Sequence, residues 1–107
     1  MEIQVKAKGL PTAKILREHA QRRIREALGG FGNVVQSVTL RLSDINGPHN
    51  DGVDKLAHIV VQLRNRSFVM EELSADIHSA IDRLAHRIRQ KLARQLEPLL
   101  NPIHGRR

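Results

Sequence analysis

The sequence predicts an α+β two-layer sandwich in the order β-α-β-β-β-α, with two helices on one face of a four-stranded sheet. Short segments in which apolar and polar residues alternate are typical of half-buried strands. Two longer segments instead place apolar residues three and four positions apart, which is the spacing of one helical face. Because each helix has a single apolar stripe, both are expected to cover the same face of the sheet.

The chain length of 107 residues suits one compact domain, which we expect to span residues 1–97. Residues 98–107 contain two prolines, a glycine and two terminal arginines. We expect this segment to be a mobile basic tail.

The first strand is expected at residues 2–8, where apolar and polar side chains alternate regularly. Residues 9–11 interrupt it, and Thr12 is a suitable N-cap for a helix that runs to about Leu28. The glycines that follow are expected to end this helix. Its solvated face alternates in charge at Lys14, Glu18, Arg22 and Glu26. Its apolar stripe consists of Leu16, Ala20, Ile24, Ala27 and Phe31.

Three further strands are expected at residues 35–44, 56–64 and 67–72. A loop rich in glycine, asparagine and proline separates the first two of them at residues 46–52. A tight turn at residues 65–66 joins the last two, so these strands should be antiparallel neighbours.

The last helix has two distinct stripes, and we expect Ser74 to cap it. It should be about 23 residues, or roughly 34 Å, long, and should project beyond the sheet. Its apolar stripe consists of Ile77, Ile81, Leu84, Ile88, Leu92 and Leu96. A neighbouring arc within roughly 80° carries basic residues, namely Arg83, Arg87, Lys91 and Arg94. One side of the helix is therefore suited to burial, and the next side is suited to an anionic partner.

The overall charge also favours an anionic partner, since the chain has 18 Lys and Arg residues, 11 Asp and Glu residues and a net charge of +7. With Phe31 and Phe68 as its only Phe, Tyr or Trp residues, the chain can hardly stack unpaired bases, so RNA would be bound through phosphates and shape. No apolar run approaches the roughly 18 residues that span a bilayer, and residues 1–10 lack the apolar region typical of a signal peptide. We therefore expect no membrane partner. The absence of cysteine fits a cytoplasmic protein and excludes thiol catalysis.

No constellation predicts catalysis, a metal site, a cofactor or a small-molecule substrate. The loop and its flanks carry four residues with potential oxygen ligands for a metal ion, namely Asp44, Asn46, Asp51 and Asp54. Pro48 breaks the calcium-loop pattern, and turn hydrogen bonds explain these residues better. Local pairing of Asp54 with Lys55 is a further expectation. His78 and His86 are too far apart for a two-histidine ligand pair on one helix.

The candidate RNA-binding site combines basic residues of both helices. Arg17 and Arg25 lie on one flank of the first helix's apolar stripe, and Arg23 lies on the other. Two neighbouring helices with such flanks are expected to form a positive groove, although the pattern leaves open which flanks face each other. The candidate residues are Arg17, Arg23, Arg25, Arg83, Arg87, Arg89, Lys91 and Arg94. Outward residues of the strands either extend this surface or are ordinary surface charges, and they are Lys6, Lys8 and Arg41.

The element order and several motifs resemble the ribosome hibernation promoting factor family, also called ribosome-associated inhibitor A or sigma-54 modulation proteins. The segment Ser74–Asp82 resembles the family's start of the last helix, and Leu16-Arg17-Glu18 resembles a family motif in the first helix. The segment Arg41–Pro48, followed by Asp54-Lys55, resembles a divergent branch of the family. Basic positions of the family motifs correspond to Arg23, Arg87 and Arg94.

The resemblance implies a cytoplasmic, bacterial factor that is not an enzyme. Such proteins bind the 30S small ribosomal subunit and its ribosomal RNA near the decoding centre. They block messenger and transfer RNA, and they silence translation when growth stops. The chain resembles the short form, which lacks a C-terminal dimerisation domain, so it is expected to be a monomer off the ribosome.

The chain departs from the family pattern at three places in the last helix. His78 replaces a usual tyrosine, His86 replaces a frequent aspartate, and an arginine is displaced to Arg89 beside Gln90. Two other functions remain open. The order α-β-β-β-α within the chain is that of a general double-stranded-RNA-binding module, and a protein-interaction adaptor is also compatible with the sequence.

Overall fold

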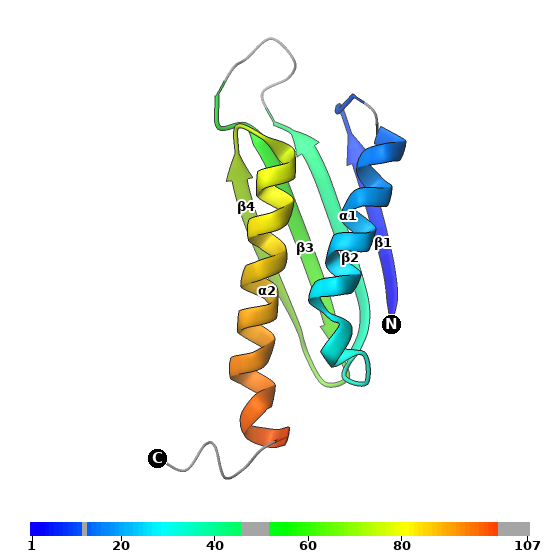
Figure 1. The fold of residues 1–107 in the computed structure, drawn as a ribbon, viewed down its shortest axis with the longest axis vertical. Helices are drawn as coiled ribbons and strands as arrows, with labels where there is room; N and C mark the ends of the chain where they lie inside the picture. Colours follow the sequence, from blue (N-terminus) through cyan, green and yellow to red (C-terminus); the bar gives the residue numbers. More distant parts are fainter. Residues whose placement is uncertain (12, 46–51, 101–107) are drawn as a thin grey trace.

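The computed structural model confirms the predicted α+β sandwich and its element order (Figure 1). It describes residues 1–11, 13–45 and 52–100, with side chains as far as residue 95. The strands are β1 (Glu2–Lys8), β2 (Val35–Asp44), β3 (Lys55–Leu63) and β4 (Ser67–Ser74). The helices are α1 (Ala13–Ala27), a short 3-10 helix (Gly29–Phe31) and α2 (Ile77–Leu100).

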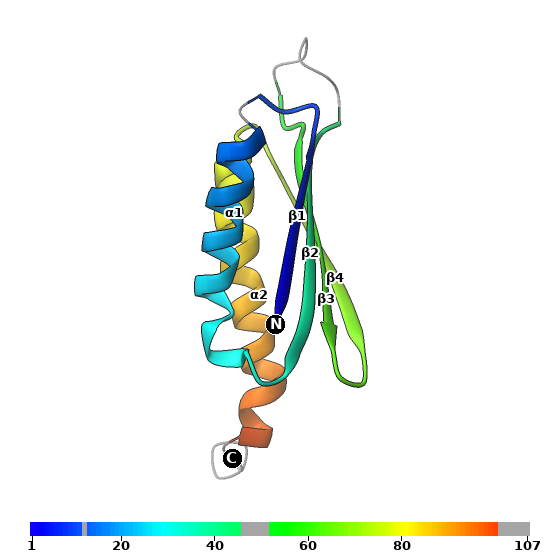
Figure 2. The same ribbon diagram turned by 90° about the vertical axis from the view of Figure 1, so that its right-hand side faces the viewer.

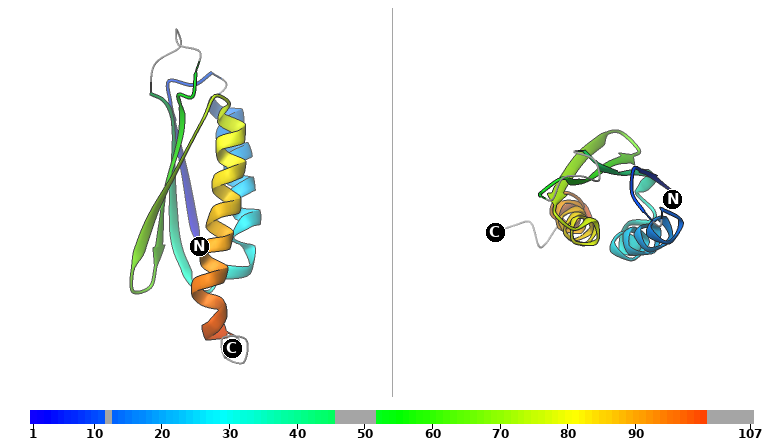
Figure 3. Two further views of the ribbon diagram at one scale, coloured as in Figure 1. Left: turned by 90° about the vertical axis from the view of Figure 1, so that its left-hand side faces the viewer. Right: turned by 90° about the horizontal axis from the view of Figure 1, so that it is seen from above.

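The sheet has the strand order β1-β2-β3-β4. β1 and β2 are parallel, with α1 as their connection, whereas β2, β3 and β4 are antiparallel neighbours. Both helices cover one face of the sheet, and no helix covers the other face in the described part of the chain (Figures 2 and 3). α1 packs over β1, and α2 packs over β3 and β4. Because of the strand order, β1 and β4 form the edges of the sheet.

A single apolar core lies between the sheet and the helices, built from the predicted stripes. In α2 the side chains of Ile81, Leu84, Ile88 and Leu92 are fully buried, and in β3 those of the alternate residues Ala57, Ile59 and Val61 are fully buried. The periodicity of the sequence therefore identifies the buried faces correctly, since burial of apolar surface is the main driving force of such packing.

The end of α1 differs from the expected glycine stop. None of the glycines after it has a positive φ, and Gly9 is the one described glycine that does, at φ 71°. Instead the chain tightens into the 3-10 helix, where the amide of Phe31 donates to the carbonyl of Leu28 at 2.9 Å. Because a 3-10 turn satisfies carbonyls at the helix end, the left-handed glycine is not required.

The start of α2 also differs from the prediction, because Asp76 and not Ser74 caps the helix. The Asp76 carboxylate accepts hydrogen bonds from the amide of His78 at 3.3 Å and from the hydroxyl of Ser79 at 3.0 Å. The Ser74 hydroxyl accepts a hydrogen bond from the Asp76 amide at 3.2 Å, in the turn that precedes the helix. β4 therefore runs two residues further than predicted, and Ser74 ends that strand opposite Lys55.

α2 continues past the end of the sheet, as its length predicts (Figure 1). It includes the first three residues of the expected tail, 98–100, and the rest of that tail lies outside the described residues. The proposed cap Thr12 and loop residues 46–51 lie outside them as well. No described helix is long and apolar enough to cross a membrane.

Candidate nucleic-acid interface

The basic arc of α2 faces β4 and points away from α1. Arg87 donates through Nη1 to the carbonyl of Glu71 at 2.8 Å and forms an ion pair with the carboxylate of Glu72. One turn later, the Lys91 ammonium lies 5.2 Å from the centre of the Phe68 ring, within the range of a cation–π contact. Two members of the predicted arc are therefore engaged by β4.

The opposite flank of α2 forms the seam with α1. Asp82 of α2 pairs with Arg23 of α1 at 3.3 Å, and Arg89 donates to the carbonyl of Ala27 at 3.2 Å. The second contact places a cation at the C-terminal end of α1, where it complements the helix dipole. Arg23 and Arg89 therefore tie the two helices together.

The imidazole rings of His19 and His78 meet edge to face near the start of α2, with their centres 5.1 Å apart. His78 occupies the position where the resemblance leads one to expect a tyrosine. It therefore supplies a ring contact between α1 and α2 at the same seam that Arg23 and Arg89 bridge further along.

The prediction of a positive groove between the two helices is wrong. The seam that separates them holds the Arg23–Asp82 ion pair, while the arc of α2 lies on its far side. The reason is geometric: at about 100° per residue, the arc and Asp82 lie on opposite sides of the apolar stripe. The candidate residues are thus divided between the seam, the β4 side of α2 and the outer face of the helices, and they do not line one cleft.

Four candidate arginines are left exposed by the fold. Within the described residues, none of them makes a hydrogen bond or ion pair through its side chain, so their guanidinium groups remain available to a partner. These residues are Arg17 and Arg25 on α1 and Arg83 and Arg94 on α2.

Arg22 is a further exposed cation on α1 that the sequence argument did not select. It belongs to the alternating ladder with Lys14, Glu18 and Glu26, which suggests mutual neutralisation. The structure confirms that these side chains are solvated, but none of the four forms an ion pair with another. Surface pairs at helical spacing are weak, so alternation alone does not show that a cation is engaged.

The outward cations of the sheet gather close to β1. Lys6 of β1 lies directly opposite Arg41 of β2, and Lys8 lies opposite Ser43. All three cations are exposed, and they lie on the face of the sheet that the two helices leave uncovered. They are therefore separated from the candidate residues of the helices by the thickness of the sandwich.

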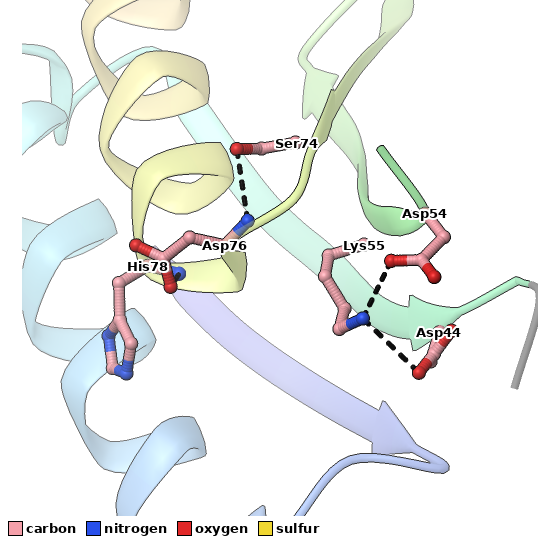
Figure 4. A network of polar contacts seen from close by, with 6 residues as sticks. All are labelled: Asp44, Asp54, Lys55, Ser74, Asp76 and His78. Carbon is pink, nitrogen blue, oxygen red and sulfur yellow. Dashed lines mark hydrogen bonds and ion pairs between the residues drawn. The ribbon is translucent and has the colours of Figure 1, made fainter. Parts of the chain in front are cut away.

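A polar network lies where α2 begins (Figure 4). The Lys55 ammonium bridges the carboxylates of Asp54, at 2.6 Å, and Asp44, at 3.3 Å. The hydrogen bond to Asp54 is the main reason that the pKa of Lys55 is raised, with Asp44 adding to it. The expected Asp54–Lys55 pairing is confirmed. The two carboxylates of the supposed calcium pattern hold a lysine, and the other two residues of that pattern lie outside the described residues.

The capping carboxylate nearby is held in its charged form. The hydrogen bond from the Ser79 hydroxyl, followed by those from the amides of His78 and Ser79, lowers the pKa of Asp76. A charged cap fits the positive end of the helix dipole. This arrangement fixes where α2 starts.

Among the solved structures that are similar to this chain, two cover most of its length. The ribosomal subunit interface protein from Coxiella burnetii gives a TM-score of 0.71 at 17% identity, covering 89% of this chain and 97% of that chain. The N-terminal domain of Protein Y from Thermus thermophilus gives a TM-score of 0.67 at 21% identity, covering 88% and 98% of the two chains. At these identities the likeness shows a shared fold.

No curated protein matches the chain by sequence. A family-level comparison does give a match: the profile described as sigma 54 modulation protein / S30EA ribosomal protein covers residues 3–99. This range includes β2, β3 and β4 in full and all but one residue of β1 and of α2, so the match concerns the whole sandwich. The chain therefore belongs to the sigma 54 modulation protein / S30EA ribosomal protein family.

Proposed function

We propose that this protein silences translation by binding the small ribosomal subunit near the decoding centre, where it blocks messenger and transfer RNA. The observation that carries the proposal is a set of unengaged arginines on the helices of a chain from this family. The similarity in fold to a ribosomal subunit interface protein supports a ribosomal partner.

The proposed contact surface is the outer face of the helical layer. Arg25 of α1 and Arg83 and Arg94 of α2 are exposed and free of partners among the described side chains. A guanidinium group binds phosphate oxygens in a bidentate manner, and ribosomal RNA presents closely spaced phosphates. A broad face that contacts several phosphates gives strong binding without reading a base sequence.

The proposed mechanism is steric, so no bond is made or broken and no cofactor takes part. The sandwich, with extents of 52 × 27 × 20 Å, provides the bulk that occupies the RNA path. In this proposal the protein acts in the cytoplasm, as a single domain that is monomeric off the ribosome.

Sedimentation with purified ribosomal subunits through sucrose gradients tests the proposal. The protein should travel with 30S subunits and not with 50S subunits. The double variant Arg83→Glu/Arg94→Glu should remain in the top fractions, because two phosphate contacts become repulsive. A matched control, Arg41→Glu/Arg64→Glu, reverses one exposed charge on β2 and one in the β3–β4 turn, and it should still sediment with 30S.

Three results would contradict the proposal. Sedimentation of Arg83→Glu/Arg94→Glu with 30S at physiological salt would exclude the helical face as the contact surface. Equal affinity for a plain RNA duplex would indicate a general double-stranded-RNA-binding module instead. Binding that survives RNase treatment and high salt would indicate a protein-interaction adaptor, because phosphate contacts are strongly salt-dependent.

A further inference from the structure

β1 is an edge strand whose outer side is only partly covered. The side-chain amide of Gln21 donates to the carbonyl of Ile3 at 3.1 Å, which shows that this carbonyl points out of the sheet. Backbone groups of alternate strand residues point the same way, so those of Val5 and Ala7 also face outward. Within the described residues no hydrogen bond reaches them from this side.

A hollow of about 300 Å³ lies between this edge and α1. The half-buried side chain of Val5 supplies its apolar part. The rest of the lining comes from α1, namely Lys14, Arg17, Glu18 and Gln21. The unpaired strand edge therefore lies beside a hollow with room for side chains of an added strand.

Cations flank the β1 edge on both faces of the sheet. Lys6 and Lys8 lie on the open face, and Lys14 and Arg17 lie on the helix side, where Glu18 is the one carboxylate of the hollow. Lys6 also lies directly opposite Arg41, a like-charge pairing that destabilises a sheet. None of these basic side chains has an ion-pair partner among the described residues.

We propose that the β1 edge binds an extended acidic segment of another protein as a fifth strand. Side chains of such a strand alternate between its two faces, and either face meets a pair of cations. Its backbone would pair with the outward groups of Val5 and Ala7. This alternation of donors and acceptors at strand spacing favours a polypeptide over an RNA backbone, which offers phosphate acceptors without the matching amide donors.

Fluorescence polarisation with a labelled peptide of about eight alternating valine and glutamate residues tests this surface, because that length matches one strand. The peptide should bind, and the Lys6→Glu/Lys8→Glu variant should weaken binding about tenfold, as expected for the loss of two surface pairs. A matched reversal at the β3–β4 turn, Arg64→Glu/Arg66→Glu, should leave the affinity unchanged. The same peptide with lysine in place of glutamate should not bind.

A second measurement separates strand pairing from simple charge attraction. N-methylation of alternate peptide amides removes strand hydrogen bonds and keeps the charge, so it should abolish binding. Hydrogen exchange at the Val5 and Ala7 amides should slow when the unmodified peptide is bound. Equal binding of the methylated peptide, or unchanged exchange, would overturn the proposal.

An RNA arm distinguishes the two classes of partner. A single-stranded RNA of similar charge should not displace the peptide. Displacement, together with loss of RNA binding in Lys6→Glu/Lys8→Glu, would assign this edge to nucleic acid. Ribosome sedimentation of Arg83→Glu/Arg94→Glu is independent of this result, because those residues belong to α2.

Discussion

Two regions of the helices carry the same kinds of basic residue but use them differently. One region consists of the flanks that contact β4 or the other helix, and the second is the outer face. Arg83 and Arg87 lie one turn apart on the same arc of α2, yet only Arg87 is held by β4. Likewise, Arg23 pairs with Asp82 at the seam, whereas Arg25, two positions later on α1, is exposed. Whether a cation stabilises the fold or remains available for binding therefore depends on what lies opposite it.

The largest expected effect comes from neutralising the exposed arginines Arg25, Arg83 and Arg94, here called the outer set. In the variant Arg25→Gln/Arg83→Gln/Arg94→Gln, the slope of log affinity for 30S against log salt should fall by about two to three units, since each phosphate contact contributes close to one. Thermal unfolding should be unchanged, because none of these side chains is engaged. An unchanged salt slope would mean that the outer set does not contact RNA.

The second effect concerns the engaged flank. Arg87→Ala should lower the free energy of unfolding by about 1–2 kcal/mol, because it removes two hydrogen bonds and leaves the half-buried Glu72 unpaired. Urea denaturation measures this change. Arg83→Ala, one turn earlier, is the matched control and should change stability by only a few tenths of a kcal/mol. Equal effects of the two substitutions would remove the distinction between the flanks.

A third substitution tests the cap at the start of α2. Asp76→Ala should destabilise the protein by about 1 kcal/mol at neutral pH, as loss of an N-cap does. Because folding lowers the pKa of Asp76 below its usual 3.8, the stabilisation is present above that value and is lost as the pH falls through the lower folded value. Denaturation of both proteins from pH 7 to pH 2 should show their difference shrinking. A constant difference would exclude the charged cap.

The smallest effect is expected at the seam. A double-mutant cycle of Arg23→Ala and Asp82→Ala should give a coupling energy of about 0.2–1 kcal/mol, because both side chains are partly exposed. High salt should reduce this coupling. A coupling of zero would mean that the pair contributes nothing to helix–helix association, and Arg23 would then join the outer set.

Most of the fold follows from local periodicity. The stripe from Ile81 to Leu92 predicts the buried side of α2, and alternation predicts the buried side of each strand. The boundary at Ser74 was predicted incorrectly because serine and aspartate are both good caps and stand two positions apart. Only the hydrogen bonds of the folded chain distinguish them.

The candidate site was less predictable than the fold. The spacing on α2 places Arg83, Arg87, Lys91 and Arg94 on one arc, and the structure agrees. That the arc faces β4 was not predictable, because the same helix could dock with either flank toward α1. The partner of Arg87 lies on a separate strand and has no helical spacing from it.

The sequence by itself determined the periodic stripes, the excess of positive charge and the motifs that resemble the family, because each depends on the composition of the chain or on residues close together in it. The tertiary structure alone decided which arginines meet a carboxylate, which strand edge remains open and which cations flank it. These outcomes depend on the order of strands in the sheet and on the side from which each helix packs. Contacts between distant segments arise only when the common core is buried, so no local pattern specifies them.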